Sequence, residues 1–215
     1  MKIHSFNTAE DLIRQTLDIL RKTLPTPGNM MLSGGSTPYV IYNRLAAAPC
    51  PVHAQRNLFL SDERMQPFNS DKNNAHNLLP MLQALDCHGN FLQVDTALSP
   101  AAAAEKYAQA LEPMKSIDLG FLGMGNDGHT AGFFTPEQAR IQNRLTLHTD
   151  RPDGMQGVSV TPAFFQRVEK IILLVTGESK RKILNTLIND PQSIAAGIAL
   201  SSHPDCELWT DLVLT

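Results

Sequence analysis

Hydrophobic positions along this chain follow two alternating patterns. Short runs that are almost entirely apolar are typical of strands buried on both faces of a sheet, while apolar residues at three- and four-residue spacing predict amphipathic helices. The first pattern predicts strands over residues 29–33, 57–61, 91–94, 117–122 and 169–175. Residues 144–148 and 157–160 are predicted as strands on either side of a Pro-Asp-Gly turn, and an alternating pattern predicts a last strand over residues 207–214. The second pattern predicts helices over residues 8–24, 37–47, 74–85, 99–111, 177–187 and 193–200.

The order of these segments indicates the fold class. Strands that alternate with helices favour a parallel sheet whose strands are joined by helical crossovers. We therefore predict an α/β fold: a doubly wound, mostly parallel sheet with helices on both faces, Rossmann-like, in a single domain over residues 1–215. In the second helix, we expect Thr37 to cap the N-terminus and Pro38 to occupy the first turn.

Size and charge narrow the classes of function. With 215 residues and 42% hydrophobic content, the chain can bury about 70% of its unfolded surface without cross-links. The net charge of -3, from 18 basic and 21 acidic residues, and the lack of a basic run longer than residues 180–182 argue against nucleic-acid binding. An anionic ligand must therefore be bound by local positive groups.

The cysteines and histidines show no disulfide or metal pattern. Cys50, Cys87 and Cys206 are scattered and odd in number, which favours a reduced, cytoplasmic protein. The N-terminus lacks the apolar core of a signal peptide, and no long uncharged apolar stretch follows, so we expect neither export nor a membrane span. No two histidines at i, i+4 spacing have a third ligand nearby, so we expect neither a metal nor a cofactor.

A glycine-rich loop after one predicted strand carries a histidine. Residues 123–131, Gly-Met-Gly-Asn-Asp-Gly-His-Thr-Ala, directly follow the apolar run 117–122. In open α/β sheets ligands bind at the carboxyl ends of the strands, and an imidazole titrates near neutral pH. His129 is therefore a candidate general base. The structural alternative is a loop histidine that only hydrogen-bonds to the backbone.

Three further loops follow predicted strands and should open at the same edge of the sheet. Residues 34–37, Gly-Gly-Ser-Thr, combine a flexible backbone, two hydroxyls and a helix N-terminus, which suits phosphate oxygens. Residues 62–64, Asp-Glu-Arg, offer a guanidinium and two acids, and Lys180 lies at a helix start, where a cation opposes the helix dipole. An ordinary capped turn, a solvated charge cluster and a surface lysine are the structural alternatives.

Four motifs occur in a fixed order along the chain. They are Leu32-Ser33-Gly34-Gly35-Ser36-Thr37-Pro38, Ser61-Asp62-Glu63-Arg64, Leu122-Gly123-Met124-Gly125-Asn126-Asp127-Gly128-His129-Thr130-Ala131 and Val175-Thr176-Gly177-Glu178-Ser179-Lys180. In order and spacing they resemble the glucosamine-6-phosphate isomerase/6-phosphogluconolactonase family, and its lactonases most. The resemblance spans nearly the whole chain. It implies hydrolysis of 6-phospho-D-glucono-1,5-lactone in the oxidative pentose phosphate pathway, without a metal or cofactor.

The resemblance also implies roles for individual residues. His129 would take a proton from the water that attacks the lactone carbonyl. Asp62 or Asp127 would orient the imidazole or fix a loop. Backbone N–H groups of the glycine loops and Arg64 are candidate donors to the tetrahedral oxyanion. The residues that would bind the 6-phosphate are Gly34, Gly35, Ser36, Thr37, Arg64 and Lys180.

Two other functions remain open. Glucosamine-6-phosphate deaminases share the Gly-Gly-Ser-Thr-Pro and Asp-Gly-His elements. They usually continue after the histidine as Ile-Ala-Phe-Asn-Glu-Pro, whereas residues 130–136 read Thr-Ala-Gly-Phe-Phe-Thr-Pro. No acid lies between His129 and Glu137, which favours a lactonase over a deaminase. A non-catalytic sugar-phosphate sensor is the third possibility, because a fold does not determine activity.

One strand departs from the family pattern. The family commonly has arginine in an Arg-x-Thr-x-Thr strand before proline, but residues 157–162 read Gly-Val-Ser-Val-Thr-Pro. The sequence does not show which residue replaces that arginine. It also leaves the oligomeric state open.

Overall fold

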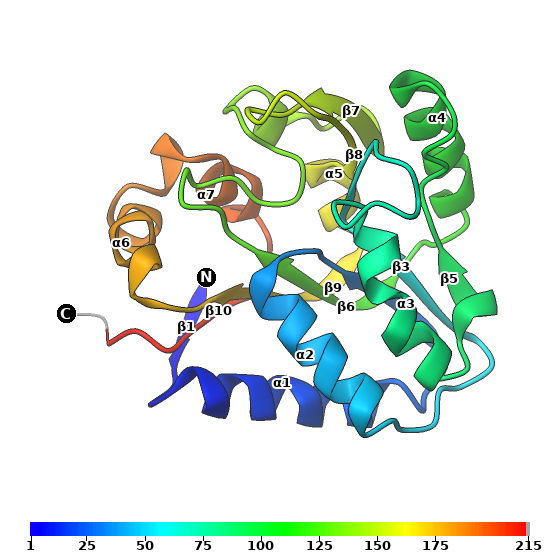
Figure 1. Ribbon diagram of the computed structural model, residues 1–215. Helices are drawn as coiled ribbons and strands as arrows, with labels where there is room; N and C mark the ends of the chain where they lie inside the picture. Colours follow the sequence, from blue (N-terminus) through cyan, green and yellow to red (C-terminus); the bar gives the residue numbers. More distant parts are fainter. Residues whose placement is uncertain (214–215) are drawn as a thin grey trace.

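A seven-stranded sheet runs through the molecule (Figure 1). The computed structural model describes residues 1–213, and the strand order is β1-β10-β9-β6-β2-β3-β5, with every adjacent pair parallel. The strands are β1 (Lys2–Ser5), β2 (Gly28–Leu32), β3 (Arg56–Leu60), β5 (Phe91–Leu92), β6 (Ile117–Gly123), β9 (Val168–Val175) and β10 (Cys206–Thr210).

Helices cover both faces of this sheet. They are α1 (Ala9–Thr23), α2 (Ser36–Ala47), α3 (Asn74–Ala84), α4 (Pro100–Leu111), α5 (Pro162–Phe165), α6 (Arg181–Asn189) and α7 (Ala195–Leu200), with single 3₁₀ turns at η1 (His88–Asn90), η2 (Gln138–Arg140), η3 (Glu178–Lys180) and η4 (Pro191–Ser193). The first three helices pack on one face, and α4 to α7 pack on the other. The predicted doubly wound α/β class is therefore confirmed.

Strand β2 shows how one strand serves both faces. Met30 and Leu32 belong to the hydrophobic cluster under α1, α2 and α3, whereas Met31 belongs to the cluster under α4 to α7. All three side chains are buried, because successive side chains of a strand point to opposite faces. This two-sided burial explains why the strands read as continuous apolar runs in the sequence.

A second, three-stranded sheet lies beside the end of β3. β4 (Asp62–Arg64) pairs antiparallel with β8 (Gln156–Val160), which pairs antiparallel with β7 (Thr146–Asp150). Only Ser61 separates β3 from β4, so the two sheets join at the carboxyl edge of the main sheet. The prediction of residues 62–64 as a loop is therefore wrong: they form a strand.

Two strand predictions at the chain ends also need correction. β1 was not predicted, because Lys2–Ser5 is an edge strand whose residues are largely exposed. The last strand ends at Thr210 rather than at residue 214, and residue 214 lies outside the described residues.

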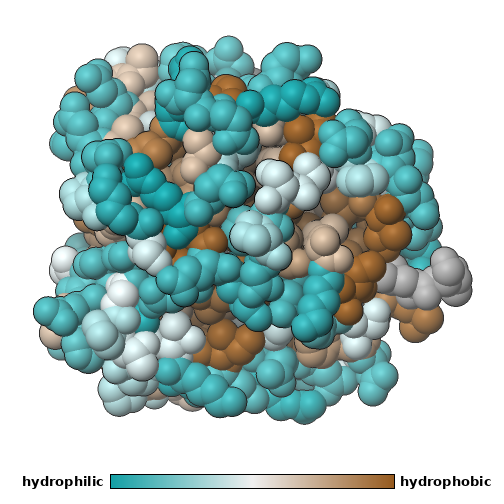
Figure 2. All heavy atoms as spheres, turned by 180° about the vertical axis from the view of Figure 1, so that it is seen from behind, coloured by the Kyte–Doolittle hydropathy of each residue, from teal (hydrophilic) through white to brown (hydrophobic). Residues whose placement is uncertain are grey.

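The next features are the cysteines, the length of the helices and the surface. Cys50, Cys87 and Cys206 are all unpaired. Within residues 1–213, no helix has the length and apolar character needed to cross a bilayer. Figure 2 shows that the rear face is mostly hydrophilic, with hydrophobic side chains exposed between polar ones.

Candidate active site

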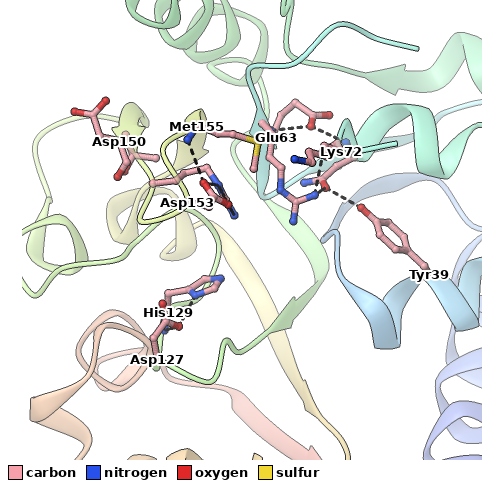
Figure 3. Close-up of polar contacts among 12 residues, drawn as sticks. Tyr39, Glu63, Lys72, Asp127, His129, Asp150, Asp153 and Met155 are labelled. Atoms are coloured by element: carbon pink, nitrogen blue, oxygen red, sulfur yellow. Dashed lines mark hydrogen bonds and ion pairs between the residues drawn. The ribbon is translucent and has the colours of Figure 1, made fainter. Parts of the chain in front are cut away.

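The carboxyl ends of β2, β6 and β9 border a cavity of about 240 Å³. β4 and the β7–β8 hairpin complete its walls, and Figure 3 shows the hairpin residues Asp153 and Met155 above His129. The predicted site residues that line the cavity are Gly34, Gly35, Ser36, Thr37, Asp62, Arg64, His129 and Lys180. Asp127 contacts His129. The structure thus brings all of the predicted site residues to one place.

The loop between β2 and α2 presents a helix N-terminus to the cavity. α2 begins at Ser36, and Gly35 at its N-cap has φ +116°, a conformation that favours glycine. No side chain caps this helix, so Thr37 is not the cap that the sequence predicts. Thr37 Oγ1 instead lies 2.7 Å from Thr176 Oγ1, in the loop after β9. An uncapped helix N-terminus offers N–H groups and a positive dipole end to an anion.

Gly34 has no room for a side chain because Asn74 packs against it. A Cβ atom at Gly34 would lie 2.5 Å from Asn74 Oδ1. The same Oδ1 accepts hydrogen bonds from Tyr39 Oη at 2.7 Å and Arg64 Nη1 at 3.1 Å, while Asn74 Nδ2 donates to the Asp62 carbonyl at 2.9 Å. The glycine therefore lets the β2–α2 loop approach the residue that holds Arg64.

Asp127 holds the imidazole of His129. Nδ1 lies 2.6 Å from Asp127 Oδ1, which also accepts from the His129 backbone N–H at 3.2 Å. Burial raises the pKa of the Asp127 carboxyl, but the charge and hydrogen bonds of His129 outweigh it and hold the pKa below its usual value. A carboxylate only accepts hydrogen bonds, so Nδ1 carries the proton and Nε2 is left as the basic nitrogen.

The backbone around His129 is tightly constrained. A Cβ atom at Gly125 would lie 2.2 Å from His129 Nδ1, and Gly125 N donates to the His129 carbonyl at 2.9 Å. Thr130 Oγ1 donates to the Gly123 carbonyl at 2.8 Å. Ala131 has φ +47°, a left-handed conformation that is uncommon outside glycine. Strain of this kind often occurs at functional sites, where the surrounding contacts hold it in place.

Glu63 is the buried member of the Asp-Glu-Arg segment. Glu63 is only 1% exposed. Oε1 accepts from the N–H groups of Arg64 and Asn74, each at 2.7 Å, and Oε2 accepts from Ala75 N at 2.8 Å. Burial raises the pKa of this carboxyl to about 7, against the opposing effect of the three hydrogen bonds. Glu63 therefore fixes the N-terminus of α3, while Asp62 and Arg64 line the cavity.

Arg64 and Lys180 are held by neutral oxygens. Arg64 Nη1 donates to the Lys72 carbonyl at 3.0 Å as well as to Asn74. Lys180 lies in η3, just before α6, and its Nζ donates to the Met124 carbonyl at 2.7 Å. Burial lowers the pKa of Lys180, and Asp127 acts in the opposite direction. Neutral partners position these two cations without neutralising them.

Sequence reasoning missed four residues that line the cavity: Ser33, Asn74, Arg151 and Thr176. Ser33 is the last residue of a predicted strand and Thr176 follows one, so their strand-end positions could have indicated them. The Ser33 hydroxyl is buried and has no hydrogen-bond partner within the described chain. Across residues 1–213 there is no group of three or more His, Cys, Asp or Glu side chains placed to hold a metal.

Comparison with known proteins identifies the family. Residues 5–206 match the family described as glucosamine-6-phosphate isomerases/6-phosphogluconolactonase. The chain belongs to this family. A 6-phosphogluconolactonase from Thermotoga maritima is 34% identical over 167 residues, which covers 75% of this chain and 74% of the relative. A crystal structure of 6-phosphogluconolactonase from Thermotoga maritima matches with a TM-score of 0.80 at 26% identity, covering 97% of this chain and 96% of that one.

The family fold is shared by enzymes with different activities. A solved monomeric glucosamine-6-phosphate deaminase also matches this chain, with a TM-score of 0.80 at 17% identity and coverage of 98% and 97% of the two chains. Likeness at that identity concerns the fold alone. The residues around His129 must therefore distinguish one activity from the other.

Proposed function

We propose that this chain is a 6-phosphogluconolactonase, which hydrolyses 6-phospho-D-glucono-1,5-lactone to 6-phosphogluconate. One observation carries the proposal: a single cavity combines an imidazole oriented by a carboxylate with two cations that hydrogen-bond to neutral oxygens. The imidazole suits ester hydrolysis, and the cations suit a phosphate group. The names of the relatives support this substrate, and the three unpaired cysteines support action in the cytoplasm.

His129 is the general base in this reaction. Its Nε2 takes a proton from water as the water oxygen adds to the lactone carbonyl carbon, which forms a tetrahedral oxyanion. The bond between that carbon and the ring oxygen then breaks, and the imidazolium returns the proton to the ring oxygen. Asp127 keeps Nδ1 protonated and stabilises the imidazolium between the two steps.

The remaining site residues bind and position the substrate. Gly34, Gly35, Ser36, Thr37, Arg64 and Lys180 form the phosphate site, which holds the carbonyl near His129. Backbone N–H groups of the glycine loops and Arg64 are the candidate donors to the oxyanion. Asp62 accepts from Ser61 Oγ at 2.9 Å, whereas Asp127 contacts the imidazole. We therefore attribute the orientation of His129 to Asp127 rather than to Asp62.

A deaminase is less well supported. The deaminase motif has glutamate five residues after the histidine, and in this chain that position is Phe134. The Phe134 ring packs on His129, with 4.6 Å between ring centroids. An aromatic hydrocarbon ring cannot exchange protons with a substrate, so this segment lacks the acid that deaminase chemistry needs.

Two assays test the proposal together. The purified protein should accelerate ring opening of 6-phosphogluconolactone above the spontaneous rate and release no ammonia from glucosamine 6-phosphate. Ammonia release without lactone hydrolysis would establish a deaminase instead. Binding of 6-phosphogluconate with neither reaction would establish a sugar-phosphate sensor.

A further inference from the structure

Arg151 is a third cation in the cavity, and the phosphate site proposed above does not include it. It directly follows β7 and lines the cavity together with Arg64 and Lys180. Its side chain is only 8% exposed. Burying a guanidinium is unfavourable unless anions and hydrogen bonds compensate for the lost water. Asp153 supplies one such anion, and an anionic ligand in the cavity would supply a second.

Asp153 and Phe134 fix the Arg151 side chain. Nε lies 3.3 Å from both carboxylate oxygens of Asp153, and Nη2 lies 3.2 Å from Oδ2. The guanidinium carbon lies 4.9 Å from the centroid of the Phe134 ring, which packs on His129. These contacts use Nε, Nη2 and one face of the guanidinium. They leave Nη1 to donate to a ligand.

The hairpin brings Arg151 to the same wall as Arg64. Gly157 on β8 is the strand partner of Arg64 on β4. A Cβ atom at Gly157 would lie 3.6 Å from Arg151 Cδ, so the arginine stem packs beside a position that has no side chain. Arg64 on β4 and Arg151 in the β7–β8 turn thus line one cavity.

The charge of the lining matches a phosphate ester only when Arg151 is counted. Three positive side chains, Arg64, Arg151 and Lys180, and one negative side chain, Asp62, line the cavity, which gives the lining a formal charge of +2. Asp153, the ion-pair partner of Arg151, lies outside this lining. A phosphate monoester carries a charge of about -1.5 to -2 at pH 7. Without Arg151 the lining would carry half of the positive charge that such a group requires.

We propose that Arg151 binds the phosphate group of the substrate together with Arg64, and that it determines specificity for phosphorylated lactones. The proposal rests on the lactonase function above. In this arrangement the hairpin supplies the arginine that strand 157–162 lacks.

The substitution Arg151→Met tests this role, because methionine keeps an apolar contact with Phe134 and removes the charge. KM for 6-phosphogluconolactone should rise about ten- to hundredfold while kcat changes less than about threefold, as expected for a lost charge-assisted hydrogen bond. For unphosphorylated glucono-1,5-lactone, kcat/KM should change less than about threefold. Arg144→Met, which removes an exposed arginine just before β7, is the matched control and should leave both substrates unaffected.

An equal fall in kcat/KM for the two lactones would overturn the proposal. An unchanged KM for the phosphorylated lactone would also overturn it. Calorimetric binding of 6-phosphogluconate separates this result from a failure of the proposed function. If the wild type hydrolyses no lactone, the lactonase proposal fails, while a Kd for 6-phosphogluconate that rises about tenfold in Arg151→Met still supports the role of Arg151. A Kd that does not change would contradict it.

Discussion

At the scale of single residues, one loop connects the proposed base, His129, to Lys180, a proposed phosphate ligand. Lys180 donates to the Met124 carbonyl, and the next residue, Gly125, donates to the carbonyl of His129. The position of Nζ relative to the imidazole is therefore set by two consecutive residues rather than by independent elements. Such a connection holds a phosphate-anchored substrate at a constant distance from the base.

The substitution His129→Gln should lower kcat by about 10²- to 10⁴-fold, the usual size of a lost general base, while KM changes little. KM should change little because other residues are proposed to bind the phosphate. Steady-state kinetics, corrected for spontaneous lactone opening, measure both constants. A folded variant within threefold of the wild-type kcat would exclude His129 as the base and direct attention to Asp62 or Glu63.

The substitutions Lys180→Ala and Arg64→Ala should each raise KM for the phosphorylated lactone by about tenfold or more, because a charge-assisted contact contributes about 1.5–3 kcal/mol. Lys180→Ala should leave kcat/KM for the unphosphorylated lactone nearly unchanged. The comparison of the two lactones is the decisive measurement. If kcat/KM falls equally for both lactones, Lys180 positions the base or its loop and does not bind the phosphate.

At the scale of secondary-structure elements, Glu63 connects β4 to the start of α3. Oε2 of Glu63 accepts a hydrogen bond from the Ala75 N–H. The substitution Glu63→Gln would place an amide N–H₂ there, so that two donors would face each other. We expect a loss of about 1–3 kcal/mol in the free energy of unfolding at pH 5, because a buried donor loses its acceptor. Urea unfolding of the two proteins measures this loss.

The difference in stability should also depend on pH. The Glu63 pKa of about 7 in the folded protein lies above its usual 4.5, so between these values the folded state holds a proton that the unfolded state has lost. The stability that Glu63 contributes is therefore complete below pH 4.5 and is lost as pH rises through 7. The difference in free energy of unfolding between the wild type and Glu63→Gln should shrink from pH 5 to pH 8. A difference that grows over this range would mean that the ionised carboxylate is the stabilising form.

The elements differ in how far the sequence predicts them. β2, β6 and β9 are buried on both faces, so their apolar runs mark them directly. β4 is a charged tripeptide that becomes a strand only because β8, far along the chain, pairs with it. Tertiary pairing of this kind has no local signal.

At the scale of the whole molecule, strand order explains which parts of the site the sequence could reveal. The motifs at residues 34–37, 123–131 and 176–180 follow strands of one parallel sheet, so their meeting at one edge could be predicted. Arg151 lies in the turn between β7 and β8 of the second sheet, and its place in the cavity wall depends on the antiparallel pairing of these two strands. Neither its spacing from the other motifs nor its neighbours in the sequence indicate that place.

Lactonase activity should survive exhaustive treatment with EDTA, because the proposed reaction needs only an imidazole, water and hydrogen-bond donors. Activity assays before and after chelation, with readdition of single divalent metals, measure this. Reversible loss on chelation, restored by one metal, would require a metal-assisted mechanism instead.

The junction of the two sheets at Ser61 has a consequence for how the molecule responds to its ligand. His129 and Lys180 lie in segments that follow β6 and β9 of the large sheet, whereas Arg64 lies on β4 and Arg151 in the β7–β8 turn of the small one. A phosphate bound by cations from both parts of the molecule would tie the two sheets together and add stability that rises with the logarithm of ligand concentration above Kd. Amide hydrogens of β4, β7 and β8 would then exchange with solvent more slowly in the presence of 6-phosphogluconate, while those of β6 and β9 in the buried sheet would change little.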